Sequence, residues 1–73
     1  MKLKEAIINQ KFYIKNGNGD KYKKISDNGH IATYNSCICL TKLEERFTDS
    51  LERISFEYQF ARKIDKEVEI VLV

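Results

Sequence analysis

The stretch TKLEERFTDSLERISFEYQFARKI, residues 41–64, changes its hydrophobic period part-way along. In its first half the apolar residues recur every three or four positions, which is the spacing of one face of an α-helix. The members of this repeat are Leu40, Leu43, Phe47, Leu51 and Ile54. Thr41 followed by Glu44 has the spacing of a capping box, which begins a helix. The pattern therefore predicts one main helix at about 42–53.

From residue 54 the apolar residues alternate instead. Five of the six even positions between 54 and 64 are apolar or aromatic, and a period of two favours a strand with one buried face. An alternative continues the helix through Tyr58 and Ala61, which leaves Phe56 and Phe60 off the apolar stripe. The sequence predicts the strand and leaves the helical alternative open.

The residues before this stretch predict a short helix followed by strands. MKLKEAIINQ (1–10) places its apolar residues on one helical face, whereas KFYIK (11–15) and KYKKIS (21–26) alternate as strands do. HIATYNSCICL (30–40) is a third strand candidate. The Asn28-Gly29 pair before it is a strong hairpin signal.

The C-terminal residues predict the last strand of the sheet. VEIVLV (68–73) is β-branched and almost entirely apolar, so we expect a central strand, with residues 65–67 turning the last hairpin. The whole chain then forms a single α+β domain over residues 1–73. It consists of a short N-terminal helix, an antiparallel sheet of about five strands and one central helix.

Composition narrows the class of protein. The chain has 73 residues, of which 42% are hydrophobic and 33% charged, as in a globular domain. It contains neither an apolar run long enough to span a membrane nor a signal-peptide pattern, so we expect a cytoplasmic protein of the cell that makes it. Cys37 and Cys39 would share one strand face as free thiols, since Cα atoms two residues apart lie at the limit for a disulfide.

Positive charge is concentrated in one segment. The net charge is +2, but residues 11–24 hold five lysines and one aspartate, a local charge of 5 − 1 = +4. Lysines contact phosphates and tyrosines stack on bases, so this segment is the candidate partner- or anion-binding site. Its candidate residues are Tyr13, Lys15, Lys21, Tyr22, Lys23 and Lys24. The simpler interpretation is a hairpin turn at the two Asn-Gly pairs, followed by a solvated arm.

Other chemistry lacks its required residues. The G-x-G at 17–19 has no third glycine for a phosphate loop, and a calcium loop begun at Asn16 would have Lys21 where glycine is obligatory. His30 is the only histidine, so a zinc site would be short of ligands, and a cysteine–histidine pair would have no third member. We therefore predict no catalytic residue, no metal site and no cofactor.

The order of the N-terminal segments carries a resemblance. MKLKEAI, a basic β segment and then SDNGHI, together residues 1–31, are similar to small phage and prophage accessory proteins of the anti-defence type. Those proteins open with a short M-x-L-x-E-A-[IL] helix and continue as a β-meander. The Thoeris anti-defence proteins, oligomeric sponges for a cyclic ADP-ribose-type signal, are relatives of that pattern. They usually carry tryptophans that this chain lacks, so the resemblance assigns no ligand residue.

The resemblance implies an accessory protein of a low-GC phage or mobile element, comparable in kind to an anti-CRISPR protein. We expect a small non-enzymatic binding protein that inhibits a host defence or regulatory protein by occupancy. The alternative is nucleic-acid or nucleotide binding through the Lys/Tyr-rich hairpin at 13–24. A homodimer completed through the apolar last strand is compatible with either function.

Overall fold

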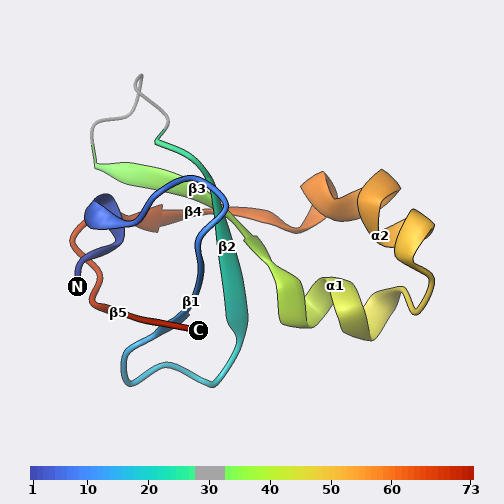
Figure 1. Cartoon of the computed structure of the whole chain (residues 1–73), viewed down its shortest axis with the longest axis horizontal. Helices are drawn as coiled ribbons and strands as arrows, with labels where there is room; N and C mark the ends of the chain where they lie inside the picture. The colour runs from blue at the N-terminus through green and yellow to red at the C-terminus, as the bar shows by residue number, and fades with distance from the viewer. Residues whose placement is uncertain (28–32) are drawn as a thin grey trace.

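The computed structural model describes residues 1–27 and 33–73 (Figure 1). In this part of the chain five antiparallel strands form one sheet, in the order β4-β3-β2-β1-β5. The strands are β1 (Lys11–Ile14), β2 (Lys21–Ser26), β3 (Tyr34–Cys39), β4 (Ala61–Asp65) and β5 (Ile70–Leu72). The α+β class and the five-stranded antiparallel sheet are confirmed.

The sheet is curled, because its two edge strands are joined by a very short connection. β4 ends at Asp65 and β5 begins at Ile70, yet they lie at opposite edges. The Val68 N–H donates to the Asp65 carbonyl (3.1 Å), so the connection contains a tight turn. A flat five-stranded sheet would hold its edges about 19 Å apart, four spacings of about 4.8 Å. The edges must therefore approach each other, and the sheet closes toward a barrel.

The place of β5 differs from the prediction of a central strand. β5 pairs with β1, with Tyr13 opposite Val71, and it lies at the end of the strand order. Residues 65–67 turn the chain but do not form a hairpin, since β4 pairs with β3 instead. Ile70 is buried whereas Val71 and Leu72 are 51% and 43% exposed, so only one residue of this entirely apolar strand is buried.

The N-terminal segment closes the seam between the two edges. The Leu3 and Lys4 N–H groups donate to the carbonyls of Val68 (2.9 Å) and Lys66 (3.0 Å). The predicted N-terminal helix is only a 3-10 turn, η1 (Leu3–Glu5). It stops there because this segment takes its backbone partners from the connection between the edge strands.

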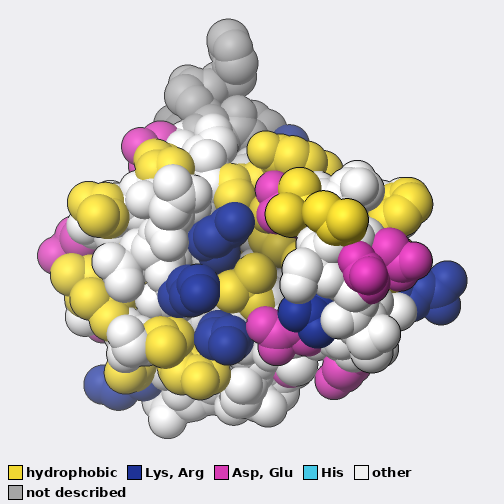
Figure 2. Space-filling view, turned by 45° about the vertical axis from the view of Figure 1, so that its right-hand side comes forward, with side chains coloured by type: hydrophobic (Ala, Val, Ile, Leu, Met, Phe, Trp, Pro, Cys, Tyr) yellow, Lys and Arg dark blue, Asp and Glu magenta, His cyan; other side chains and the backbone are white. Residues whose placement is uncertain are grey.

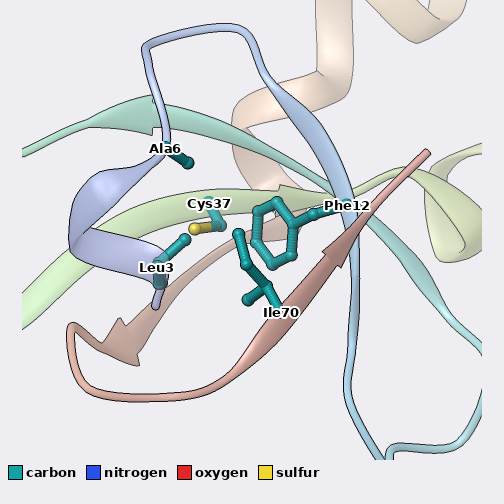
Figure 3. Close-up of a cluster of buried hydrophobic side chains, with 5 residues drawn as sticks. All are labelled: Leu3, Ala6, Phe12, Cys37 and Ile70. Atoms are coloured by element: carbon teal, nitrogen blue, oxygen red, sulfur yellow. The ribbon is translucent and has the colours of Figure 1, made fainter. Parts of the chain in front are cut away.

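One apolar core fills the inside of the curled sheet. Its buried members come from the N-terminal segment and from three strands, and they point toward one another (Figure 3). They are Leu3, Ala6, Phe12, Cys37 and Ile70. Both cysteines are free and buried, so the thiol of Cys37 serves here as a small apolar side chain.

The predicted helix at 42–53 is in fact two short helices. These are α1 (Leu40–Arg46) and α2 (Ser50–Phe56), and the backbone at Phe47 between them is extended (φ −126°, ψ 122°). The break is stabilised by Asp49, whose carboxylate accepts the N–H groups of Leu51 (2.8 Å) and Glu52 (3.3 Å). The Asp49 cap therefore starts a new helix within residues 42–53, where hydrophobic spacing alone predicts one continuous helix.

The start of α1 also differs from the prediction. The helix begins at Leu40, with no side-chain cap. Thr41 does not act as the capping residue, because its Oγ1 accepts the backbone N–H of Lys21 (2.8 Å) at the start of β2. The threonine therefore joins the helix to the sheet.

Residues 54–60 are helical, which corrects the predicted strand at 54–64. α2 continues to Phe56, the 3-10 turn η2 (Glu57–Phe60) follows, and only β4 is extended. Phe56 stacks on Phe47 (ring centroids 5.0 Å apart) and Phe60 meets the same ring edge-on (6.2 Å), whereas Ile54 and Tyr58, which share the alternation, are 68% and 71% exposed. The period of two therefore does not mark a single buried face. The helical alternative is therefore correct up to Phe60.

A second apolar cluster lies where the helices meet the sheet. Its buried members are Ile38, Leu40 and Leu43, with Ile25, Phe47 and Phe60 packed against them. Leu51 and Ile54, predicted to continue this stripe, are instead 74% and 68% exposed. The break at Phe47 turns α2 so that the second half of the stripe faces solvent.

Some predictions lie outside the described residues. These are the Asn28-Gly29 hairpin, His30 and the first residues of the third strand candidate. Among the helices that are described, none combines the length and apolar character needed to cross a membrane.

Candidate functional site

The register of β1 and β2 brings lysines together on the outside of the curled sheet. Lys11 lies opposite Lys23, and Tyr13 lies opposite Lys21. Phe12, between Lys11 and Tyr13, points into the core, so alternation along the strand directs its two neighbours to the opposite, outer face. Three lysines and one tyrosine therefore share one outer surface.

Two of the predicted site residues lie on the other side of the sheet. Tyr22 stacks on Phe12 (ring centroids 5.6 Å apart, planes 19° apart) and packs against the core. Burial raises the pKa of its phenol above the usual value. Lys24 is only 1% exposed. Neither residue belongs to a binding surface on the outside of the hairpin.

Lys24 holds the N-terminal segment in place. Its Nζ donates to the carbonyls of Ala6 (2.7 Å) and Leu3 (3.3 Å) and forms an ion pair with Asp27 (2.7 Å). The ion pair lowers the pKa of the Asp27 carboxyl. Because all the polar contacts of this buried ammonium are internal, Lys24 acts in the fold and not in recognition.

Lys21 and Lys23 are partly neutralised by the helical part of the chain. Lys21 Nζ lies 3.9 Å from a Glu44 oxygen, and Lys23 Nζ lies 3.7 Å from a Glu57 oxygen. Lys11 and Lys15 form no ion pair within residues 1–27 and 33–73, and both are exposed. The uncompensated positive charge of this surface therefore lies at the two ends of β1, at Lys11 and at Lys15 directly after the strand.

The structure adds two residues that the prediction omitted. Lys11 lies two residues before Tyr13, so the alternation of KFYIK places both side chains on the same face of the strand. Val71 lies directly opposite Tyr13 on β5, and these two side chains are 51% and 38% exposed. No sequence signal paired β5 with β1. We call the resulting surface the lysine face and define it as Lys11, Tyr13, Lys15, Lys21, Lys23 and Val71.

Figure 2 shows one side of the molecule, on which Lys and Arg side chains gather near the centre with hydrophobic side chains on both sides. A surface of this kind combines positive charge with apolar contact area. It fits an anionic group or an acidic protein surface better than an apolar one.

The double Asn-Gly segment between β1 and β2 is a turn, as predicted. Asn16 has φ 61° and Gly19 has φ 90°, and the Asn18 side chain accepts the Asp20 N–H (3.0 Å). Such left-handed positions reverse a strand in few residues. Within the described chain no group of three His, Cys, Asp or Glu residues is placed to hold a metal ion.

The cysteines have the properties of structural thiols. Cys37 is fully buried, and burial raises the pKa of its thiol to about 12. The thiol is therefore protonated at neutral pH, whereas the thiolate is the nucleophilic form.

The described residues form no pocket at the surface. His30, which a cysteine–histidine pair would require, lies outside the described residues.

No protein-family model, curated protein or solved structure matches this chain.

Proposed function

We propose that this chain is a small non-enzymatic binding protein, encoded by a phage or mobile element, that inhibits a host defence or regulatory protein by occupying its surface. The proposed site is the lysine face, and the proposed compartment is the host cytoplasm. The observation that carries the proposal is the exposed, uncompensated charge of Lys11 and Lys15 beside the exposed side chains of Tyr13 and Val71.

The arrangement of the lysines supports recognition of a negative partner. Lys11 and Lys23 lie directly opposite each other on neighbouring strands, and like charges in that position destabilise a sheet. An acidic partner surface would relieve this repulsion, while Tyr13 and Val71 would supply apolar contact. Because these side chains stand on strands, the surface is formed before binding.

Nucleic-acid or nucleotide binding is the second candidate function. Tyr13 lies on β1 between Lys11 and Lys15, the residue after the strand, and opposite Lys21 on β2, so one ring is available for stacking among cationic groups. The ion pairs of Lys21 with Glu44 and of Lys23 with Glu57 weaken this candidate, because phosphates would have to compete with two carboxylates.

Capture from a bacterial host lysate tests the proposal. The double variant Lys11→Glu/Lys15→Glu changes the net charge from +2 to 2 − 4 = −2, and we expect at least a tenfold loss of recovered partner. Lys42→Glu/Lys63→Glu makes the same charge change at exposed sites elsewhere and should retain it. Native mass spectrometry of the eluate identifies the class of the bound mass.

Three outcomes separate the candidates. A protein that is retained by wild type and the control variant but lost by the β1 variant supports inhibition by occupancy. A nuclease-sensitive or nucleotide mass, bound with an affinity that falls steeply with salt, supports the alternative instead. Equal recovery by both double variants would show that the lysine face is not the binding site.

A further inference from the structure

The helix α2 has one packed side and one open side. On the packed side Phe56 stacks on Phe47, and the Arg53 guanidinium donates to the carbonyls of Phe47 (2.8 Å) and Thr48 (3.1 Å). The arginine therefore turns inward over the break between the helices. None of the residues of α2 is buried, which leaves this short helix with little tertiary packing of its own.

The open side of α2 and the turn η2 after it carry the most exposed large apolar side chains of the helical part. Leu51 and Ile54 are 74% and 68% exposed and lie three residues apart on one face of α2. Tyr58, in the 3-10 turn η2 that follows α2, is 71% exposed. We call these three residues the α2 stripe. Figure 1 shows α2 at the far side of the molecule from both termini. A helix usually presents polar residues to solvent, so an apolar open side indicates a surface that is covered in an assembly.

We propose that the chain forms a two-fold symmetric homodimer in which the α2 stripe packs against the α2 stripe of a second copy. In such an interface a surface meets itself, so charges of one sign within it would repel. The α2 stripe contains no charge. The lysine face contains several of one sign and is therefore unsuited to self-pairing. Of these two surfaces, charge favours the α2 stripe for self-pairing.

The residues beside the α2 stripe favour close approach of two helices. By helical position Ser50 and Ser55 are its neighbours on either side, and both are small and uncharged. The Ser55 hydroxyl is already satisfied, since it donates to the Leu51 carbonyl (2.9 Å). Glu57, which lies in η2 seven residues after Ser50, is ion-paired with Lys23, so its charge is partly compensated. With antiparallel helices and the two-fold axis near Ile54, Leu51 of one copy would meet Tyr58 of the other.

The available area sets the strength of the dimer. Three side chains of this size, each about 70% exposed, supply on the order of 400 Å² per copy, against about 800 Å² per partner in a standard stable interface. Neighbouring residues add part of the remainder. We therefore expect a weak, reversible dimer whose population rises with protein concentration, and not an obligate one.

Sedimentation velocity of the whole chain, from about 10 µM to about 1 mM, tests the proposal against this expected affinity range. The wild type should shift from monomer to dimer with concentration. Ile54→Glu should remain monomeric over the range, because it would bury a carboxylate at the two-fold axis. Ile7→Glu, which changes an equally exposed side chain in the N-terminal segment, should dimerise as the wild type does. Both sites are exposed, and circular dichroism checks that both variants are folded.

A cysteine substitution locates the interface. Ser55→Cys should form a disulfide-linked dimer under mild oxidation, because the two copies of residue 55 would lie near the axis. Thr48→Cys, at the break before α2, should cross-link much more slowly. The native cysteines are buried and do not compete.

Several results would overturn the dimer. They are a wild type that is monomeric at the highest concentration, an Ile54→Glu variant that dimerises normally, species that grow beyond a dimer, or equal cross-linking of the two cysteine variants. None of them bears on the lysine face, which is tested by its own charge reversals. If both proposals hold, each dimer presents two lysine faces, and binding to a partner with repeated sites gains from avidity.

Discussion

Lys23 and Lys24 are adjacent in the sequence and differ only in the side of β2 that they occupy. Lys23 lies on the outer surface, ion-paired with Glu57, whereas Lys24 lies inside with its Nζ on two backbone carbonyls. A sequence of consecutive lysines predicts a solvated arm. The structure divides it into one surface residue and one internal residue because side chains alternate along a strand.

This difference predicts unequal effects of the same substitution. Lys24→Met should lower the free energy of unfolding by about 2–4 kcal/mol, because it removes the donor to the Ala6 carbonyl, leaves the Leu3 carbonyl with only the Ala6 N–H, and takes the ion-pair partner from Asp27. Lys23→Met removes an ion pair that is partly exposed and should cost less than about 1 kcal/mol. Urea unfolding followed by circular dichroism compares them. Equal losses would contradict the assigned role of Lys24.

The buried thiols give a second prediction at the residue scale. Cys37 and Cys39 should resist alkylation in the folded protein, since both are buried and the pKa of Cys37 is raised to about 12. In denaturing urea both thiols should react fully with iodoacetamide at pH 8, as counted by mass spectrometry. Rapid labelling of the folded chain would show that the curled sheet opens easily.

At the scale of elements, Asp49 determines that the helical stretch contains two helices. The hydrophobic spacing runs through residues 47–49, but the backbone at Phe47 is extended and Asp49 caps the next helix. The same break turns Leu51 and Ile54 away from Leu43 and its cluster. One capping residue therefore decides whether the apolar stripe is core or surface.

Removal of this cap should weaken α2 without unfolding the sheet. Asp49→Ala should lower the free energy of unfolding by about 1 kcal/mol, because the N–H groups of Leu51 and Glu52 lose their acceptor. Asp49→Asn keeps an acceptor oxygen and should lose only a fraction of that. Hydrogen exchange of the α2 amides measures the local effect. Faster exchange in both variants alike would show that the side-chain cap is not what stabilises the helix.

At the scale of the whole molecule, ion pairs join the N-terminal segment to the connection between β4 and β5. Lys2 and Lys4 both bind Glu67, with Nζ–Oε distances of 2.7 and 2.9 Å. These hydrogen bonds and charges lower the pKa of Glu67 to about 2 from an ordinary value of 4.5. The ionised carboxylate is thus favoured in the folded chain, and its stabilising effect is complete above about pH 4.5.

Acid should therefore weaken the seam over a defined range. As the pH falls from 4.5 toward 2, Glu67 becomes protonated and its contribution to stability is lost. Glu67→Gln should flatten the pH dependence of the unfolding free energy in this range. Glu52→Gln changes a carboxylate outside the described ion pairs and should leave the pH dependence of the unfolding free energy unchanged. Asp27, whose pKa is also lowered, keeps part of the acid dependence in both variants.

The sequence by itself determined the order of the strands, a helical segment between the third and fourth strands, and the turn at the Asn-Gly pairs, because those features follow from local periodicity and from backbone preferences of single residues. It also placed Lys11, Tyr13 and Lys15 on one face of a strand. These properties depend on neighbours within a few positions of each other.

Tertiary structure alone decided which strands became edges, which side of β2 was inside and which half of the apolar stripe was buried. The pairing of β5 with β1 depends on a curled sheet, and the burial of Lys24 depends on the carbonyls of an N-terminal segment 18 and 21 residues away. In a local sequence pattern, an apolar or a cationic side chain is compatible with a place in the core or at the surface. Their place is set by long-range packing, which has no period in the sequence.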